Sequence, residues 1–346
     1  MAPGIISKLI AFAFTLTYAL LSASMVLFGI FMKIIKKGPK GVFSCKTRDT
    51  RPPCMDNPDL GTHGFLRIKD VRLHYVSAGD ETKPLMLMLH GFPECWYSWR
   101  YQITEFKKTY RVVAIDQRGY GDSDIPSGVA NYSLKKLVED IKEVVSGLGY
   151  NSCTLVAHDW GGLVAWYVAA TYPDIVDKLI VMNIPHPRCF TDSVEGGNLK
   201  QLLASWYMFF FQLPFLPELN GWINDYGLIS GCFLGDGMGL QNKENMSKED
   251  LEAFKYSASR KGSLTGMINY YRAAFRYRVG IKSSMSTPTL IIWGDQDKAL
   301  TLKLLDGTGK YVQDLTIKIV PGASHWVQQD APEAVNKHMR EFLSGK

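Results

Sequence analysis

The stretch that decides the fold is residues 155–162, Leu-Val-Ala-His-Asp-Trp-Gly-Gly. It joins a short apolar run at residues 153–157, typical of a buried strand, to a segment that begins a predicted helix. Two small residues, Ala157 and Gly161, lie two positions before and after Asp159. Small neighbours allow a sharp turn that holds one side chain up at the edge of a sheet. The segment therefore predicts a nucleophile elbow whose exposed side chain is the carboxylate of Asp159.

Similar apolar runs occur on both sides of the elbow and predict further strands of one sheet. They are short and nearly continuous, as in a parallel sheet covered on both faces, and they lie at residues 84–88, 111–115, 178–182, 289–293 and 316–320. Two β-like runs, residues 65–68 and 71–77, precede them as a hairpin. Residues 134–148 carry an apolar stripe at helical spacing behind Ser133, a candidate N-cap. This alternation predicts the α/β class, with a mostly parallel, doubly wound sheet.

A long segment, residues 187–286, interrupts the alternation of strands and helices. It is rich in aromatic residues, above all at residues 205–211, Ser-Trp-Tyr-Met-Phe-Phe-Phe. A structureless loop of this length is uncommon inside a compact domain. We therefore expect a helical cap over the sheet, which divides the catalytic core into residues 63–186 and 287–346.

The N-terminal region predicts a membrane anchor. Residues 9–32 contain no charged residue and are bracketed by Lys8 and Lys33. As a helix rising about 1.5 Å per residue, this run is long enough to cross a hydrocarbon core of about 30 Å. The alternatives are a cleaved secretory signal, whose apolar region usually covers only about 7–15 residues, and a buried helix of a soluble protein. We predict a transmembrane anchor at residues 1–37 and, after it, an extended polar tether at residues 38–62.

Basic residues gather on one side of this apolar run. Seven lysines and arginines and a single aspartate lie at residues 33–51, and together they account for the whole formal net charge of +6. By the positive-inside rule, this side and the rest of the chain face the cytosol. We expect a single-pass membrane protein of the endoplasmic reticulum (microsomal), with the lipid bilayer as a partner of its anchor. No basic surface is left over for nucleic acid.

The cysteines and histidines show no metal-binding pattern. Six cysteines lie far apart, without CxxC or Cys/His spacing, which predicts reduced thiols in a cytosolic setting. His158 and His186 have no carboxylate or cysteine partner at metal-ligand spacing, so we interpret them as packing or turn residues. His90 is interpreted as a structural residue of a turn. We expect neither a metal nor another cofactor.

A carboxylate at the elbow decides the class of reaction. Asp159 is already ionised near pH 7 and can displace a leaving group at saturated carbon, which produces an ester of the enzyme itself. Hydrolysis of that ester creates an oxyanion on Asp159, and backbone N–H groups must stabilise it. The candidate donors are the N–H of Trp160 and that of Phe92, which lies in the turn after the strand at residues 84–88.

Two later motifs complete a predicted triad. Asp297 ends a Trp-Gly-Asp-Gln-Asp sequence, and His325 ends a Gly-Ala-Ser-His sequence. The chain order of nucleophile, acid and base is that of α/β hydrolases. His325 is the predicted general base, and Asp297 is expected to orient it and stabilise its imidazolium. Asp295 lies on the same loop as Asp297 and stays open as the alternative acid.

Five motifs in one order are highly specific together: HGFPECWYSWR (90–100), DQRGYGDSD (116–124), HDWGG (158–162), WGDQD (293–297) and GASHW (322–326). From residue 62 to the C terminus the chain resembles the α/β-hydrolase epoxide hydrolases. The similarity is greatest to the membrane-anchored vertebrate branch related to the C-terminal domain of soluble epoxide hydrolase. The resemblance implies the α/β-hydrolase fold with Asp159, Asp297 and His325 as the triad, and Phe92 and Trp160 as oxyanion donors.

The resemblance also implies two catalytic tyrosines in the cap, whose hydroxyl groups hold and protonate the epoxide oxygen. The matching positions are Tyr207, in WYMFFFQLP, and Tyr271, in MINYYRAAF. Met208 departs from the family pattern, in which a polar residue often follows the first tyrosine. The implied reaction, that of an ether-bond hydrolase, converts an epoxide to a vicinal diol through an ester of Asp159.

Two other functions fit part of the pattern. A haloalkane dehalogenase shares the aspartate nucleophile but holds the halide with a side-chain N–H donor, which the ring of Phe92 lacks. A catalytically silent hydrolase-fold protein that binds lipid or a partner would commonly lack a member of the triad. We therefore expect a small-molecule epoxide as the substrate and no obligate protein partner. The aromatic, methionine-rich cap favours lipid or fatty-acid epoxides.

Overall fold

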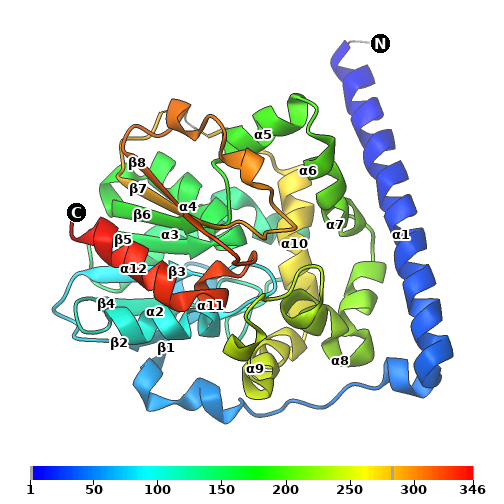
Figure 1. Ribbon diagram of the computed structural model, residues 1–346, viewed down its shortest axis with the longest axis horizontal. Coiled ribbons are helices and arrows are strands. Elements are labelled where there is room, and N and C mark those ends of the chain that lie inside the picture. The colour runs from blue at the N-terminus through cyan, green and yellow to red at the C-terminus, as the bar shows by residue number, and fades with distance from the viewer. Residues whose placement is uncertain (1–2, 282–283, 346) are drawn as a thin grey trace.

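One β-sheet organises the molecule (Figure 1). The computed structural model describes residues 3–281 and 284–345, and there the sheet has eight strands in the order β1-β2-β4-β3-β5-β6-β7-β8. β1 (Thr62–Ile68) and β2 (Val71–Ala78) form an antiparallel hairpin. β2 also pairs with β4 in the antiparallel sense, whereas all the other pairs are parallel. The mostly parallel sheet predicted from the sequence is confirmed.

The remaining strands coincide with the apolar runs of the sequence. They are β3 (Leu85–Leu89), β4 (Arg111–Ile115), β5 (Cys153–His158), β6 (Val176–Met182), β7 (Thr289–Gly294) and β8 (Leu315–Val320). Every residue of β3, β4, β5 and β7 is buried. Side chains on both faces of these strands therefore avoid water, which explains why the runs are apolar throughout.

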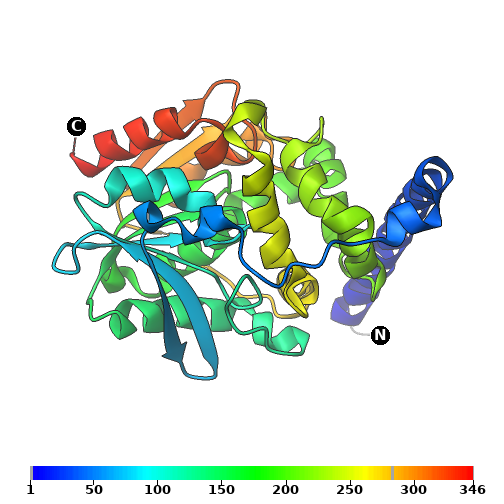
Figure 2. The same ribbon diagram turned by 90° about the horizontal axis from the view of Figure 1, so that it is seen from below.

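Helices cover both faces of the sheet (Figure 2). α3 (Leu134–Gly147) and α4 (Asp159–Thr171) lie on one face, and α2 (Arg100–Phe106), α11 (Val327–Asp330) and α12 (Pro332–Leu343) lie on the other. Ser133 occupies the N-cap position of α3, but its side chain makes no capping hydrogen bond. Its backbone N–H closes the preceding 3₁₀ turn on the carbonyl oxygen of Ala130 instead, at 3.3 Å.

Between β6 and β7 the chain forms the expected helical cap. Its helices are α5 (Pro187–Glu195), α6 (Leu199–Ala204), α7 (Trp206–Phe210), α8 (Leu216–Leu234), α9 (Lys248–Ser259) and α10 (Ser263–Arg276). α8 is interrupted near its middle, where Asn224, Asp225 and Tyr226 all have positive φ. Such conformations are unfavourable for residues other than glycine, so the interruption needs support from its surroundings.

The N-terminal helix α1 (Pro3–Phe43) runs alongside the cap and contacts α7 and α8 (Figure 1). Its segment Phe12–Phe43 is long and apolar enough to cross a membrane. Small side chains such as Ala19 and Ala23 are buried, whereas large ones such as Phe28 are exposed. The helix therefore presents a narrow face to the cap and a bulky apolar face to the outside.

The extended tether expected at residues 38–62 is extended only in part. The helix breaks at Gly38, whose φ is 71°, a short helical segment follows to Phe43, residues 44–52 have no helix or strand, and two 3₁₀ turns precede β1. Arg48 explains why the segment is docked, because its buried guanidinium bonds both carboxylate oxygens of Asp225 (2.8 and 2.7 Å) and both of Glu252 (3.2 and 3.0 Å). Asp225 stands in the interruption of α8. The tether is thus a structural support of the cap.

Candidate active site

Asp159 lies at the sharp turn between β5 and α4. Its backbone has a φ of 46°, a strained conformation for a residue other than glycine. The turn brings Gly161 so close to β3 that a Cβ atom there would lie 2.4 Å from the carbonyl oxygen of Leu89. At Gly91, a Cβ atom would lie 2.4 Å from the Cβ atom of Asp159. Glycine at both positions allows the carboxylate to sit against the turn that follows β3.

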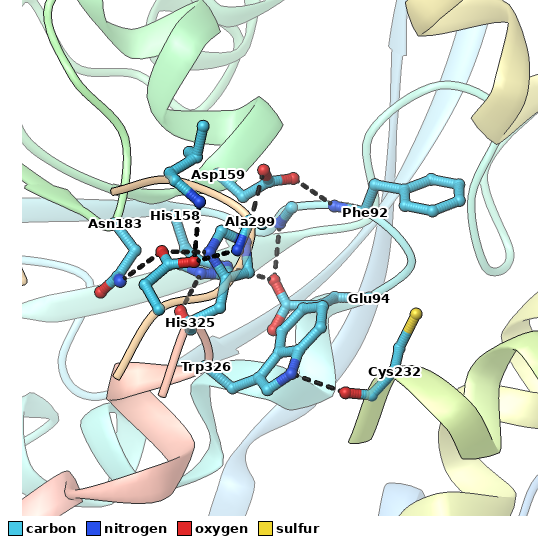
Figure 3. Close-up of polar contacts among 12 residues, drawn as sticks. Phe92, Glu94, His158, Asp159, Asn183, Cys232, Ala299, His325 and Trp326 are labelled. Carbon is cyan, nitrogen blue, oxygen red and sulfur yellow. Dashed lines mark hydrogen bonds and ion pairs between the residues drawn. The ribbon is translucent and has the colours of Figure 1, made fainter. Parts of the chain in front are cut away.

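The backbone N–H of Phe92 faces this carboxylate (Figure 3). The N–H of Phe92 donates a hydrogen bond to Oδ1 of Asp159 at 2.8 Å. Trp160 lies in the first turn of α4, where N–H groups have no acceptor within the helix. The amide of Phe92 therefore contacts the carboxyl group on which the oxyanion would form, and the amide of Trp160 stays a predicted second donor.

His325 links the nucleophile to a second carboxylate. Its Nε2 lies 3.5 Å from Oδ2 of Asp159, and its Nδ1 lies 2.7 Å from Oδ2 of Asp297. Asp297 also accepts hydrogen bonds from Nδ2 of Asn183 (2.7 Å) and from two backbone N–H groups of the loop that follows it (2.8 and 2.9 Å). These bonds fix the acid, and the acid fixes the imidazole with Nε2 toward the nucleophile.

The alternative acid, Asp295, points away from the histidine. Its Oδ1 accepts hydrogen bonds from the N–H of Gly322 at 2.8 Å and from the side chain of Gln296 at 3.0 Å. Asp295 therefore ties its own loop to the loop that leads into His325. The partner of the histidine is Asp297.

The charged groups of the triad shift one another's pKa. Burial raises the pKa of Asp159, but the proximity of His325 and His158 and the bond from Phe92 lower it, on balance below its usual value. Burial lowers the pKa of His325, but the charge of Asp297 and contacts with both carboxylates raise it, on balance to about 10. Near neutral pH the nucleophile is therefore ionised and the histidine protonated.

A buried polar layer beneath the triad was not predicted. Glu94 accepts a hydrogen bond from the N–H of Gly91 (2.8 Å), and its Oε2 lies 2.7 Å from Nδ1 of His158. Nε2 of His158 bonds the carbonyl oxygen of His325 at 2.8 Å. Burial raises the pKa of Glu94, but the pairing with His158 and the Gly91 bond lower it below its usual value. Glu94 and Asn183 position the triad, although no spacing in the sequence indicates this role.

The other two histidines considered in the sequence serve the backbone. His90 lies in the turn that carries Phe92, and its Nε2 accepts a hydrogen bond from the backbone N–H of Gln117 at 3.2 Å. His186 occupies the N-cap position of α5 and accepts the N–H of Arg188 at 3.3 Å. Both have the structural roles predicted for them.

The cap contributes Tyr207 from α7 and Tyr271 from α10. Both line the space above Asp159, and their ring centroids lie 5.8 Å apart. Tyr271 also packs edge-on against Phe92 (5.2 Å) and Trp160 (4.9 Å). Burial and the charge of Asp159 raise the pKa of both tyrosines. Each hydroxyl group therefore keeps its proton at neutral pH and can donate it.

The neighbouring Tyr270 has a different environment. Its hydroxyl group donates to the carbonyl oxygen of Arg118 at 2.8 Å, and its ring is fully buried. Of the two adjacent tyrosines in α10, Tyr271 lines the space above the nucleophile and Tyr270 ties the helix to the core.

Two cavities meet at the nucleophile. The larger has a volume of about 560 Å³ and extends toward α8, and the smaller, of about 150 Å³, extends toward α5. Asp159, Tyr207 and Tyr271 line both cavities. A substrate can therefore lie across Asp159 with an apolar group on either side of its reacting carbon.

Known proteins share the sequence and the fold of this chain. A family model described as the alpha/beta hydrolase fold matches residues 84–332. Epoxide hydrolase 4 of Homo sapiens is 46% identical over 89% of this chain and 86% of that protein. Epoxide hydrolase 1 of Caenorhabditis elegans is 45% identical over 91% of this chain and 77% of that protein. A crystal structure of an epoxide hydrolase from Bacillus megaterium has a TM-score of 0.75 at 37% identity, and the match covers 81% of this chain and 100% of that one.

Proposed function

The chain belongs to the epoxide hydrolases of the α/β-hydrolase fold, and we propose that it converts an epoxide to a vicinal diol through an ester of Asp159. One observation carries the proposal: a carboxylate stands at the elbow, and Tyr207 and Tyr271 line the same cavity above it. A carboxylate attacks saturated carbon, and phenolic hydroxyl groups neutralise the alkoxide that leaves.

In the first step a carboxylate oxygen of Asp159 attacks one carbon of the epoxide ring. The new carbon–oxygen bond forms the ester as the ring carbon–oxygen bond breaks. Tyr207 and Tyr271 donate hydrogen bonds to the departing oxygen, and one of them gives it a proton and becomes a tyrosinate. The product of this step is a hydroxyalkyl ester of the enzyme.

Once Asp159 is an ester and its charge is gone, His325 releases its own proton to the solvent. In the second step the neutral imidazole removes a proton from water, and the resulting hydroxide attacks Cγ of Asp159. The N–H groups of Phe92 and Trp160 stabilise the oxyanion of the tetrahedral intermediate. The intermediate collapses and expels the diol, whose oxygen takes a proton from His325. The remaining proton of the new carboxylic acid passes to the tyrosinate, His325 takes up a proton from the solvent, and the enzyme returns to its starting state.

A single turnover in ¹⁸O-labelled water, with enzyme in excess over an aryl epoxide, tests this mechanism. We expect the label in the peptide that contains Asp159 and an unlabelled diol, because the diol takes its oxygen from the carboxylate. Label in the diol alone would show direct attack by water and contradict the proposal. Parallel assays with a fatty-acid epoxide and a haloalkane separate epoxide hydrolysis from dehalogenation and from a silent binding protein.

We propose further that α1 anchors the protein in the endoplasmic reticulum membrane and that the catalytic domain faces the cytosol. The cluster of basic residues 33–51 after the apolar run supports this orientation. Exposed apolar side chains of the cap beside α1, such as Leu203 and Trp206, suit contact with lipid. Carbonate extraction should leave the protein in the pellet, and protease added to intact microsomes should digest the catalytic domain. A mature N terminus near Ser24 would show cleavage instead.

A further inference from the structure

The larger cavity extends beyond the cap to the N-terminal helix. Lys33 of α1 lines it beside Trp206 and Asn220 of the cap, and Lys298 lines it from the loop that follows Asp297. The helix predicted as a membrane anchor is therefore also a wall of the cavity that contains the nucleophile.

Contacts on both sides of Lys33 hold this part of α1 in place. About one turn before it, Ile30 is buried in a small cluster with Ile223 of α8. About one turn after it, Nζ of Lys37 donates a hydrogen bond to Oδ1 of Asn224 at 2.7 Å. The ammonium group of Lys33 is thus carried on a fixed section of helix at the outer end of the cavity.

The two lysines give this cavity a positive charge at its rim. Among the residues that the structure describes, the only carboxylate lining the cavity is the nucleophile Asp159. Lys46 of the tether and Lys255 of the cap lie elsewhere and form ion pairs. Within the described residues, neither Lys33 nor Lys298 has a carboxylate within 4.0 Å. Most of the remaining wall is apolar or aromatic.

We propose that Lys33, assisted by Lys298, binds the negatively charged end group of a largely apolar epoxide. The preferred substrate is then a lipid epoxide with a free carboxylate, whose chain fills the cavity as far as Asp159. Both lysines are exposed at the outer end of the cavity, so each attracts a carboxylate with the modest strength of a solvent-screened ion pair. This inference rests on the proposed function and adds two specificity-determining residues to it.

The test compares two substrates in the full-length protein in a non-ionic detergent. One is the epoxide of a long-chain monounsaturated fatty acid, and the other is its methyl ester. In Lys33→Gln the ratio of kcat/KM for the acid to that for the ester should fall by about fivefold, as for a partly exposed ion pair. Lys33→Glu should lower the ratio further, and added salt should lower it in the wild type.

Lys36→Gln is the matched control, since it removes the same charge from α1 at a position that does not line the cavity. It should leave the ratio unchanged. An unchanged ratio in Lys33→Gln would overturn the inference while the proposed function stands. Absence of turnover of either substrate by the wild type would overturn the proposed function itself. Faster turnover of the same acyl chain within a phosphatidylcholine than of the free acid would also overturn the carboxylate assignment.

Discussion

The core side and the cap side of the substrate cavity are built in different ways. On the core side, hydrogen bonds of 2.7–2.8 Å hold Asp159 to a backbone amide and His325 to Asp297. On the cap side, Tyr207 and Tyr271 are held mainly by packing against other aromatic rings. Directed bonds suit the core, where the same two steps recur with every substrate. Aromatic packing suits the cap, whose contacts define which substrates fit.

The cap depends in addition on a segment far from it in the sequence. Arg48, from the tether, bonds Asp225 in the interruption of α8 and Glu252 in α9. Three successive residues of that interruption have strained backbone conformations. The cap wall of the cavity is strained and held by ion pairs, so substitutions should disturb it more easily than they disturb the triad, which the sheet holds. The experiments below test this difference.

The largest expected effect comes from the core side. Asp159→Ala should lower turnover by at least about 10⁴-fold, because no other group can form the ester. His325→Gln should block only the second step and trap a covalent intermediate. Intact-protein mass spectrometry should then show the added mass of one epoxide. If His325→Gln never gains this mass, the two-step mechanism is wrong.

The next largest effect belongs to the cap hydroxyl groups. Tyr207→Phe and Tyr271→Phe keep the ring packing and remove one donor each, so each should slow ester formation by on the order of 10²-fold. The double variant should be slower still. Pre-steady-state measurement of ester formation provides the readout.

Tyr270→Phe is the control for this experiment, since the hydroxyl of Tyr270 bonds the Arg118 carbonyl oxygen. It should cost about 1 kcal/mol of stability and leave the rate of ester formation unaffected. A wild-type rate in Tyr271→Phe would contradict epoxide opening by the cap and favour a dehalogenase instead.

A smaller effect should follow from release of the tether. Arg48→Gln leaves Asp225 and Glu252 without their main partner. Both carboxylates are partly exposed, so we expect a loss of about 2 kcal/mol, less than for a fully buried pair. The melting temperature should fall, and KM for a long-chain epoxide should rise more than kcat falls. Lys46→Gln, whose ammonium is exposed and 3.5 Å from the same Glu252, should change neither. Equal effects of Arg48→Gln and Lys46→Gln would show that Arg48 of the tether does not support the cap.

The core of the site could be predicted because its signals are local. A buried parallel strand has to be apolar, and an elbow needs small residues beside its nucleophile, so Asp159 stands out within a few residues of sequence. Asp297 and His325 follow predicted strands in the chain order of the fold. The sequence favoured Asp297 as the acid but left Asp295 open, because only the structure shows which of these two residues of one loop points to His325.

The rest of the site depends on contacts that leave no periodic pattern. Arg48 is far from Asp225 in the sequence, and no motif near either residue indicates their contact. The tyrosines Tyr207 and Tyr271 were indicated by family resemblance, since in an aromatic segment any ring could serve as packing. The docking of α1, which places Lys33 at the cavity, could not be predicted either. An apolar helix has the same composition whether it faces lipid or forms the wall of a cavity.

The smallest expected effect concerns pH and again separates the two halves of the reaction. Burial lowers the pKa of His325, but Asp297 and the contact with Asp159 raise it to about 10 in the free enzyme. The histidine is therefore protonated when the epoxide binds, which does not hinder an attack by Asp159, whose own pKa is lowered. Once Asp159 is an ester, its negative charge is gone, so the pKa of His325 falls and the imidazole can act as a base.

With a neutral epoxide, kcat should therefore rise with pH and level off below about pH 10. Between pH 6 and pH 8 we expect kcat to increase by less than about tenfold. Over the same range kcat/KM should stay nearly flat, because ester formation needs only the ionised carboxylate. Steady-state rates from pH 5 to 9 measure both quantities. The sign is decisive: a histidine that had to be protonated for ester hydrolysis would make kcat fall as the pH rises. Such a fall would show that His325 acts as an acid in the limiting step and that the alkylated enzyme does not lose its proton.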